Sequence, residues 1–395
     1  MADVTNYIDR LVAELCPDGV EYRPLGELLG YEQPTKYLVS SKDYDDSYPT
    51  PVLTAGKTFI LGYTNEAEGI YPASKEEPVI IFDDFTTAFK WVEFPFKAKS
   101  SAMKMLTLKS GTDSLFKYVY YAMQCIVYNS SDHARQWISK YSNIEVPVPP
   151  LEIQEAIVEI LDKFTNLEAE LEAELEARTL QYEYYRDSLF EALDCPRVPL
   201  GSLGTFVRGN GLQKKDLQES GNPVIHYGQV FTRYGLHEDK TLSYANDEVY
   251  DKLRKAEKGN LVIATTSEND EDVCKALAWL GETPAGISGD AYIYRHEMNP
   301  KYVSYFFTTH DFQRQKLRHI TGTKVRRVSG KNLETIEIPL PSLEEQQRIV
   351  DILDRFDTLT TSLSEGLPAE LAARRSQYEY YRDQLLTFPR KGENQ

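Results

Sequence analysis

The sequence predicts an α+β chain in which two mixed α/β domains are separated by two long antiparallel coiled-coil helices, as a pseudo-two-fold internal repeat. The main observation is a recurring stretch: IEVPVPPLEIQEAIVEILDKF at 144–164 is matched by IEIPLPSLEEQQRIVDILDRF at 336–356. Each copy later reaches the same tract, QYEYYRD, at 181–187 and at 377–383. The segments before the two copies also contain strand-like and helix-like runs in a similar order. A repeat of this length indicates duplication of one structural unit.

Each repeated stretch is expected to form a long helix that packs against another helix. Its apolar residues follow alternating steps of three and four, which places them on one seam of a helix. Ser342 and Glu345 have the spacing of a capping box that begins the second helix. Gly366 and Pro368 are expected to break or kink it within four extra residues of the second copy. The seam comprises Ile153, Ile157, Ile160, Phe164, Leu167, Leu171, Leu175, Tyr182, Tyr185 and Leu189 in the first copy.

The chain divides into five segments. They are 1–20, a helical stub expected to pack beside the C-terminal helix and complete the repeat; 21–143, the first domain; 144–194, the central helical spacer; 195–335, the second domain; and 336–395, the C-terminal helical spacer. Turn residues bound the apolar runs of both domains. We predict strands at Thr50–Leu53, Pro78–Phe82 and Met103–Leu108 with a helix at Leu115–Val127, and then strands at 223–231, 260–265 and 291–295 with a helix near 301–318.

The composition favours folded domains in a reducing compartment. At 395 residues, with 41% hydrophobic residues, the chain is long enough for two or three domains with their own cores. Its four cysteines form no Cys-x-x-Cys pair and accompany no histidine cluster, so neither a zinc site nor a disulfide framework is expected. The sequence shows no N-terminal apolar run and no apolar stretch of about 18 residues. We therefore expect a cytoplasmic protein without a membrane partner.

The acidic charge is concentrated in the helical segments. The whole chain carries −17, which argues against a nucleic-acid binder if the charge is spread evenly. The formal charge is −11 for 144–194 and −4 for 336–395, but −2 for 21–143 and +3 for 195–335. A nearly neutral domain can still carry a basic face. Both domains therefore remain compatible with DNA binding.

The clearest polar signal lies at the end of each domain. Basic residues interleaved with Ser, Thr and Gly on a loop suit contacts to phosphates and base edges. The alternative is a solvated surface, which is the usual role of a charge run. The residues are Lys324, Arg326, Arg327 and Lys331 in the second domain, and His133, Arg135, Trp137 and Lys140 in the sparser segment of the first.

Turns after predicted strands supply weaker candidates for the same role. Thr86 and Thr87 follow the strand PVIIF, and Thr265 and Thr266 follow the strand NLVIAT at a comparable place. Lys214 lies beside the tract GNG at 209–211. Hydroxyl and ammonium groups in such turns suit DNA contact, but they also occur as ordinary turn residues.

Several enzyme signatures are incomplete in this sequence. Gly56-Lys57-Thr58 resembles the end of a phosphate-binding loop, but Pro51 occupies the position of the leading glycine. FVRGNG at 206–211 lacks the helix and βαβ setting of a cofactor-binding turn. The N-P-P-aromatic or D-P-P-aromatic tetrapeptide of amino-methyltransferases is absent from the sequence, and Asp83, Asp84 and Lys90 are a weak basis for a metal nuclease. We expect neither a catalytic residue nor a metal site.

The repeated tracts resemble one family closely, the specificity subunit of type I restriction-modification systems. The resemblance is carried by P-x-P-x-L-E-x-Q in both copies and by the closing QYEYYRD tracts. YEQPTKYLV, PVLTAGKTFILGYTN and PVIIFDDFTTAFKW look like one variety of target recognition domain in the IC-like branch. The resemblance implies a non-catalytic subunit whose two target recognition domains each read half of a split, asymmetric sequence on double-stranded DNA.

The same resemblance implies partners that carry the chemistry. Two modification subunits would dock on the helices and bring S-adenosylmethionine for methylation of adenine N6, which requires extrusion of the base. Restriction subunits would bring ATP, Mg and cleavage. The paired helices would act as a ruler between half-sites, and the tandem EAEL-EAEL at 168–175 would set their length. A second class stays open, a coiled-coil adaptor with two protein-binding domains, which the acidic helices favour and the KVRRVSGK loop at 324–331 opposes.

These considerations select two sets of candidate residues. The tyrosines of the QYEYYRD tracts could stack on bases, but their helical spacing favours packing against a helix or a partner. For DNA binding the candidates are Lys36, Thr86, Thr87, Arg135 and Lys140 in the first half, and Arg208, Lys214, Thr265, Thr266, Lys324, Arg326 and Arg327 in the second. For partner binding they are Ile157, Leu161, Phe164, Tyr184, Tyr185, Ile349, Leu353, Phe356, Tyr380 and Tyr381.

Overall fold

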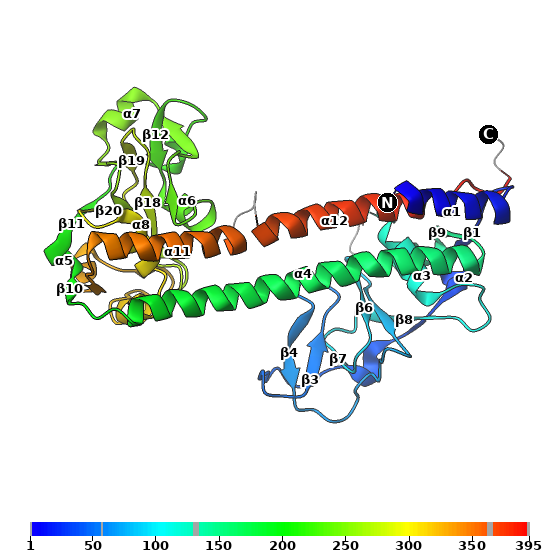
Figure 1. Cartoon of the computed structure of the whole chain (residues 1–395). Helices are drawn as coiled ribbons and strands as arrows, with labels where there is room; N and C mark the ends of the chain where they lie inside the picture. Colours follow the sequence, from blue (N-terminus) through cyan, green and yellow to red (C-terminus); the bar gives the residue numbers. More distant parts are fainter. Residues whose placement is uncertain (1, 57, 129–133, 362–365, 393–395) are drawn as a thin grey trace. The chain divides into compact units, whose positions relative to one another are not determined.

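The computed structural model describes residues 2–56, 58–128, 134–361 and 366–392, and it divides into two compact units. The first unit comprises Met1–Glu170 with Leu371–Gln395, and the second comprises Leu171–Glu370. Helices α4 (Leu151–Glu191) and α12 (Gly366–Leu385) cross this division, so each unit holds one domain and part of the helical spacers (Figure 1). Among the described helices, none is long and apolar enough to cross a membrane.

The first unit contains two sheets and a helix that links them to α4. Its other elements are α1 (Ala2–Leu15), β1 (Glu21–Pro24), α2 (Leu25–Leu28), β2 (Leu29–Glu32), η1 (Pro34–Tyr37), β3 (Thr50–Leu53), β4 (Ile60–Thr64), β5 (Val79–Asp83), β6 (Phe89–Val92), β7 (Lys97–Ala98), β8 (Met103–Leu108), α3 (Phe116–Gln124), η2 (Tyr141–Asn143) and β9 (Glu145–Val148). One sheet has the order β2-β8-β5-β6, the other β4-β3-β7, and β1 pairs with β9. One core joins Phe82 of β5, Tyr118 of α3 and Ile157 of α4, so α3 packs between the larger sheet and α4.

The second unit repeats this plan with a larger sheet. Its other elements are β10 (Arg197–Pro199), α5 (Leu200–Leu203), β11 (Gly204–Arg208), η3 (Lys214–Asp216), β12 (Asn222–Ile225), α6 (Tyr227–Thr232), β13 (His237–Glu238), β14 (Ser243–Ala245), α7 (Asp247–Lys252), β15 (Lys255–Ala256), β16 (Leu261–Ala264), β17 (Thr266–Ser267), β18 (Lys275–Trp279), β19 (Ala285–Ile287), β20 (Ala291–His296), α8 (Pro300–Phe306), α9 (His310–Leu317), β21 (Arg326–Arg327), α10 (Gly330–Leu333), β22 (Glu337–Pro339) and α11 (Leu343–Thr361). The main sheet has the order β11-β20-β16-β18-β13, beside a four-stranded sheet, β14-β12-β19-β15. Two strand pairs, β10-β22 and β17-β21, complete it.

The α+β class and the internal repeat are confirmed, and two of the predicted elements are wrong in detail. The expected strand at 223–231 ends at Ile225 and continues as α6, which His226 caps by accepting the Gly228 N–H on its ring nitrogen. The expected single helix near 301–318 is two helices, because Thr309 caps α9 with a hydroxyl that accepts the Phe312 N–H. Both errors come from polar caps that interrupt an apolar pattern.

One half of the predicted capping box is present at the start of the second long helix. Ser342 Oγ accepts the Glu345 N–H at 3.3 Å, as an N-cap should, while the Glu345 carboxylate pairs with Arg348. Farther along, α11 ends at Thr361 and α12 begins at Gly366, whose φ of +81° glycine adopts without the steric cost borne by other residues. The second copy therefore forms two helices, and the second of them begins at the predicted glycine.

The same hydrogen bond attaches each domain to the strand that precedes its long helix. In the first unit the Tyr118 hydroxyl donates to the carbonyl of Pro147 at 3.1 Å. In the second unit the Tyr302 hydroxyl donates to the carbonyl of Pro339 at 2.8 Å. Burial raises the pKa of both phenols, so both stay protonated and able to donate.

A second pair of contacts reaches the helix itself. Tyr121 donates to Asp162 on α4, and Tyr305 donates to Asp354 on α11 at 2.7 Å. Both tyrosines and both aspartates occupy corresponding places in the two copies. The helices have therefore kept similar sequences where they anchor the domains, because each anchor needs a defined donor and acceptor.

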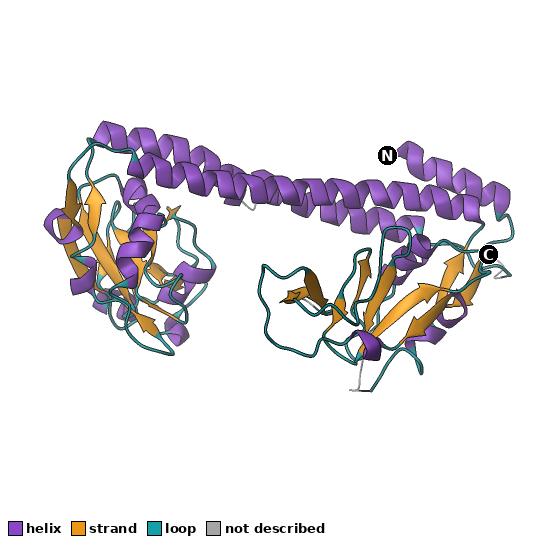
Figure 2. Ribbon diagram, turned by 90° about the horizontal axis from the view of Figure 1, so that it is seen from below, coloured by secondary structure: helices purple, strands orange, loops and turns teal. Residues whose placement is uncertain are grey.

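The helical spacers pair within each unit. In the first, Phe164 of α4 stacks on Tyr381 of α12 at 5.7 Å, and Glu168 pairs with Arg375. Because the later residue of α4 meets the earlier residue of α12, the two segments run antiparallel. In the second, Phe356 of α11 stacks on Tyr185 of α4 at 5.7 Å. Figure 2 shows long helices running side by side. The N-terminal stub lies beside the end of α12, since Ile8 of α1 and Leu385 of α12 belong to the same core, and the Val20 N–H also donates to the carbonyl of Pro389.

Candidate nucleic-acid interface

The candidate residues of the first domain gather at one edge of the four-stranded sheet. β2 ends at Glu32 and β5 ends at Asp83, and both ends pair with the beginning of β8. Lys36 follows β2, whereas Thr86 and Thr87 follow β5. Antiparallel register therefore brings these two segments, far apart in sequence, to the same edge.

The turn after β5 presents its residues outward. The Asp83 carboxylate accepts the N–H groups of Phe85 and Thr86 at 2.9 and 2.8 Å. Thr87 has a φ of +59°, an uncommon conformation for a β-branched residue. Phe85 is 40% exposed and Thr86 is exposed as well. Asp83 thus holds the turn through its carboxylate.

Asp84 connects this turn to the basic segment at the end of the domain. Its carboxylate accepts the Trp137 N–H at 2.8 Å, and its carbonyl accepts the Gln136 N–H at 2.8 Å. The Asp84 carboxylate also lies 3.1 Å from the ammonium of Lys104, and both side chains are fully buried. Arg135 and Lys140, both exposed, flank the segment that Asp84 holds. His133 lies outside the described residues.

The second domain places its candidates at the corresponding sheet edge. β11 ends at Arg208 and β16 ends at Ala264, and both ends pair with the beginning of β20. The Arg208 Nε donates to the carbonyl of Gly289 at 2.8 Å, which fixes the direction of its exposed guanidinium. Lys214 follows in η3 and is exposed. Lys214 also helps to lower the pKa of His226, although burial is the larger cause.

The two threonines after β16 have a different place from the one expected. Thr265 is 4% exposed and Thr266 is 9% exposed. The Thr265 backbone N–H donates to the carbonyl of Asp290, and Thr266 pairs with Arg327 in the β17-β21 ladder. In this conformation both threonines are buried, and their backbones pair with neighbouring segments.

In the basic segment of the second domain, one arginine is bonded to neighbouring residues of the domain and two other cationic side chains are exposed. The Arg326 Nε lies 2.8 Å from a carboxylate oxygen of Asp270, and its Nη1 donates to the carbonyl of Gly322. Lys324 and Arg327 are exposed, and neither forms an ion pair with the residues the structure describes. In the first domain Lys36 is exposed but paired with Glu32 at 3.0 Å. Arg327 is therefore better placed than Arg326 to meet an external anion or base edge.

Matching hydrogen bonds show which residues correspond between the two edges. The Gln136 N–H donates to the carbonyl of Asp84, just as the Val328 N–H donates to the carbonyl of Thr265. Arg135 and Arg327 each come directly before the donor, so they occupy equivalent positions. The offset of 192 residues that relates 144 to 336 also relates 135 to 327. This equivalence was available from the sequence, but only the shared hydrogen bonds give it a structural meaning.

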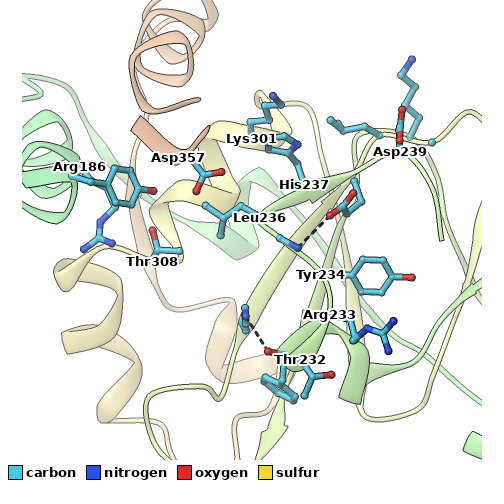
Figure 3. A pocket seen from close by; sticks show the side chains of 18 of the residues that line it. Arg186, Thr232, Arg233, Tyr234, Leu236, His237, Asp239, Lys301, Thr308 and Asp357 are labelled. Carbon is cyan, nitrogen blue, oxygen red and sulfur yellow. Dashed lines mark hydrogen bonds between the residues drawn. The ribbon is translucent and has the colours of Figure 1, made fainter. Parts of the chain in front are cut away.

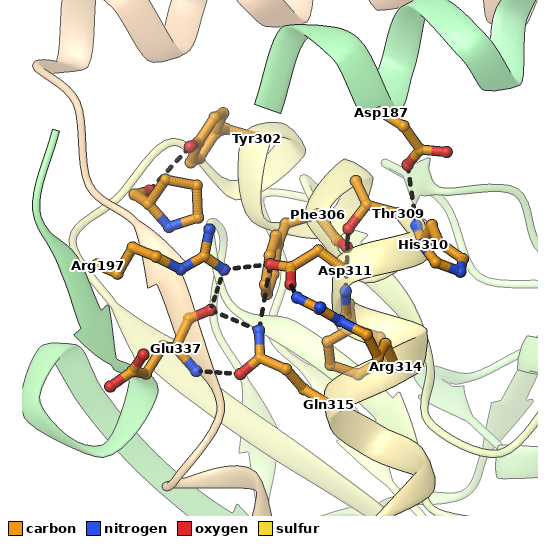
Figure 4. A network of polar contacts seen from close by, with 12 residues as sticks. Asp187, Arg197, Tyr302, Phe306, Thr309, His310, Asp311, Arg314, Gln315 and Glu337 are labelled. Atoms are coloured by element: carbon orange, nitrogen blue, oxygen red, sulfur yellow. Dashed lines mark hydrogen bonds and ion pairs between the residues drawn. The ribbon is translucent and has the colours of Figure 1, made fainter. Parts of the chain in front are cut away.

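A polar network fastens the second domain to the QYEYYRD tract of α4 (Figure 4). The Asp187 carboxylate accepts the His310 N–H at the start of α9, at 2.9 Å. Asp311, the next residue, pairs with both Arg197 and Arg314. The acidic end of the tract thus satisfies a helix N-terminus, where backbone N–H groups lack intrahelical acceptors.

The partner-binding candidates divide into buried and exposed side chains. Phe164 and Phe356 stack on Tyr381 and Tyr185, so they pair helices within each unit. Tyr184 is 69% exposed and Tyr380 is 59% exposed, so these corresponding tyrosines remain available. The fully buried ones, which serve the chain's own cores and offer no surface here, are Ile157, Leu161, Ile349 and Leu353.

Comparisons with known proteins agree with this repeat. A model of the type I restriction modification DNA specificity domain matches the chain twice, at residues 17–177 and 197–373. The type I restriction enzyme EcoR124I/EcoR124II specificity subunit of Escherichia coli is 44% identical, over 98% of both chains. A putative type I restriction enzyme specificity subunit of Haemophilus influenzae is 28% identical, over 93% of this chain and 96% of its own.

Solved structures share the fold at low sequence identity. The S subunit of a type I restriction-modification system from M. genitalium aligns with a TM-score of 0.53 and 14% identity, covering 93% of this chain and 96% of that one. A chain from a study of complex assembly in the type I R-M system aligns with a TM-score of 0.56 and 15% identity, covering 93% and 97%. With both matched repeats in place, the chain belongs to the family of type I restriction-modification DNA specificity subunits.

Proposed function

We infer that this chain is the DNA-recognition subunit of a type I restriction-modification complex, and we propose that each domain reads one half of a split target. The observation that carries the proposal is the equivalence of Arg135 and Arg327 at corresponding sheet edges. Arginine can bind a guanine edge through two hydrogen bonds or bind a phosphate. Two similar readers on one chain suit two half-sites on one duplex.

The chain itself supplies recognition, and partners supply the reaction. We propose that two modification subunits dock on the helical spacers, with the exposed Tyr184 and Tyr380 as corresponding contacts. They would bring S-adenosylmethionine and methylate adenine N6 after extruding the base. Restriction subunits would add ATP-driven translocation and Mg-dependent cleavage, and the complex would act in the cytoplasm.

The helical spacers are proposed to fix the distance between the two half-sites. A helix advances about 1.5 Å per residue, so its length converts directly into a span along DNA. The tandem EAEL-EAEL at 168–175 lies in α4 where one unit gives way to the other. A change in its copy number would then alter the unread gap and leave both half-sites intact.

The decisive experiment is long-read methylation sequencing of cells that express the chain with its modification subunit. Arg135→Ala is expected to relax the first half-site alone, and Arg327→Ala the second alone, each by about 1–3 kcal/mol of discrimination. Each variant is the matched control for the other. Relaxation of both half-sites by either variant would contradict the assignment of one reader to each half.

A binding assay separates DNA reading from the adaptor alternative. The complex with modification subunits is expected to bind duplex DNA with an affinity that falls as salt rises, because phosphate contacts release counterions. Assembly without any salt-dependent binding to duplex DNA would favour an adaptor with two protein-binding domains.

A further inference from the structure

A large groove lies in the second unit, between the helical spacers and the domain (Figure 3). It measures about 1450 Å³, and Tyr182, Arg186, Thr308 and Asp357 are among its lining residues. Figure 3 shows Arg186, Asp357 and Thr308 near one another at one end of it. The candidate DNA-binding residues do not line this groove.

Tyr182 is a buried residue in this groove, and its hydroxyl lacks a hydrogen-bond partner among the residues that the structure describes. The residue is 7% exposed, and its hydroxyl oxygen makes no hydrogen bond to any described residue. Unpaired buried polar groups are uncommon, since burial removes hydrogen bonds to water without replacing them. The hydroxyl oxygen is itself closed to solvent in this conformation, so an acceptor from outside the chain reaches it only when the side chains around it shift.

The first unit shows what the missing partner is. Tyr378, which corresponds to Tyr182 in the second QYEYYRD tract, donates its hydroxyl to Gln124 Oε1 at 2.5 Å. Gln124 lies three residues after Tyr121, and Thr308 lies three residues after Tyr305, so Thr308 takes the place of Gln124. The Thr308 hydroxyl instead donates to the carbonyl of Tyr305 at 2.7 Å.

The rings and guanidinium groups around the two tyrosines are alike, whereas Asp357 beside Tyr182 stands where the first copy has Thr165. The guanidinium of Arg186 lies 5.7 Å from the Tyr182 ring, and that of Arg382 lies 5.8 Å from the Tyr378 ring. A phenylalanine flanks each tyrosine, at 6.5 Å in the second unit and 6.4 Å in the first. Replacement of a glutamine by a shorter threonine thus removes the acceptor that the first unit has, and among the described residues no other group takes its place on the Tyr182 hydroxyl.

We propose that the groove beside Tyr182 receives a polypeptide segment of the modification subunit, which places a glutamine or asparagine amide oxygen on the Tyr182 hydroxyl. The inserted amide takes the place that Gln124 fills in the first unit. This proposal rests on the proposed function, because it assumes that the modification subunit docks on the helical spacers. It makes the two docking sides of the chain chemically different.

Size and charge favour a polypeptide over other occupants. The groove exceeds the roughly 300–1,000 Å³ of a typical small-molecule site. Its lining carries five lysines and arginines against four acidic residues, so it lacks the excess of positive charge that a phosphate backbone requires. It also borders the helical spacers, because Tyr182 and Arg186 of α4 and Asp357 of α11 are among its lining residues.

The inference is tested with a variant whose own side chain occupies the place beside the Tyr182 hydroxyl. Thr308→Gln is expected to supply the missing amide, raise the Tm of the free full-length chain by about 2–4 °C, and weaken one of two modification-subunit binding steps at least tenfold, or about 1.4 kcal/mol. Thr308→Ser keeps a short side chain and is expected to leave both binding steps unchanged. Isothermal titration of the purified chain with the modification subunit gives the affinities and the stoichiometry.

A second pair of variants distinguishes a specific loss of binding from a general loss of folding. Tyr182→Phe removes an unpaired hydroxyl, so the free chain should be at least as stable, while the same binding step weakens by about threefold or more. Tyr378→Phe removes a paired hydroxyl and should lower the Tm without changing that binding step. If both Thr308→Gln and Tyr182→Phe bind the modification subunit with unchanged affinity, no segment of that subunit bonds to Tyr182. This result would overturn the present inference and leave the proposed function intact. If the wild-type chain binds no modification subunit, the proposed function fails with it.

Discussion

The buried ion pair between Asp84 and Lys104 is expected to control how the first domain presents its DNA-facing segments. Both side chains are fully buried, 3.1 Å apart, and the Asp84 carboxylate also accepts the Trp137 N–H. Lys104→Met removes one charge and leaves the other buried without its counter-ion. Loss of one partner of a buried pair costs about 3–5 kcal/mol, so the first unit should be destabilised by that amount.

Hydrogen exchange measured by mass spectrometry can locate the destabilisation caused by Lys104→Met within the first domain. Faster exchange is expected at the amides of Gln136 and Trp137, whose acceptors are on Asp84, while peptides of the second unit keep their rates. Specificity for the first half-site should relax in the same variant, because Arg135 precedes these amides.

The double variant Asp84→Asn with Lys104→Met is the matched control. It removes both charges, while the side-chain amide introduced in place of the carboxylate still offers an oxygen to the Trp137 N–H, so much of the lost stability should return. The second domain already has the neutral Thr265 at the position of Asp84, which shows that the edge tolerates an uncharged residue. If Lys104→Met were as stable as the wild type, with unchanged exchange at Gln136 and Trp137, the proposed connection between turn and basic segment would be refuted.

Two further predictions concern the helices and the pH response. Deletion of one EAEL from 168–175 shortens α4 by about 6 Å, which corresponds to between one and two base pairs, and methylation sequencing should show a shorter gap between unchanged half-sites. An unchanged gap would argue against a ruler. Burial lowers the pKa of His296 to about 4, so its folded form resists protonation and stability falls as the pH drops from about 6.5 towards 4. Denaturation across this range should show the second unit losing up to about 3 kcal/mol, a loss that His296→Phe should reduce and that would not change if another group were responsible.

The architecture could be predicted from the sequence alone, because the repeated residues are the ones that pack and cap the helices. Apolar seams, a capping serine and the glycine at 366 act locally, so their effect on the helices follows from spacing alone. The tyrosines and aspartates that anchor each domain also recur, which is why duplication was visible. The same locality explains the two misassigned elements, where His226 and Thr309 cap helices inside stretches that looked continuous.

Only the tertiary structure decided which candidate residues share a surface. Antiparallel pairing with β8 and β20 brings turns from distant parts of each domain to one sheet edge, and no sequence spacing encodes that register. Exposure also distinguishes the candidates: Arg327 lies at the surface, whereas Thr265 and Thr266 are buried beside it. Ile157, which the sequence assigned to a partner surface, is part of the core. Secondary structure depends on near neighbours along the chain, whereas exposure depends on what the whole fold packs against each side chain.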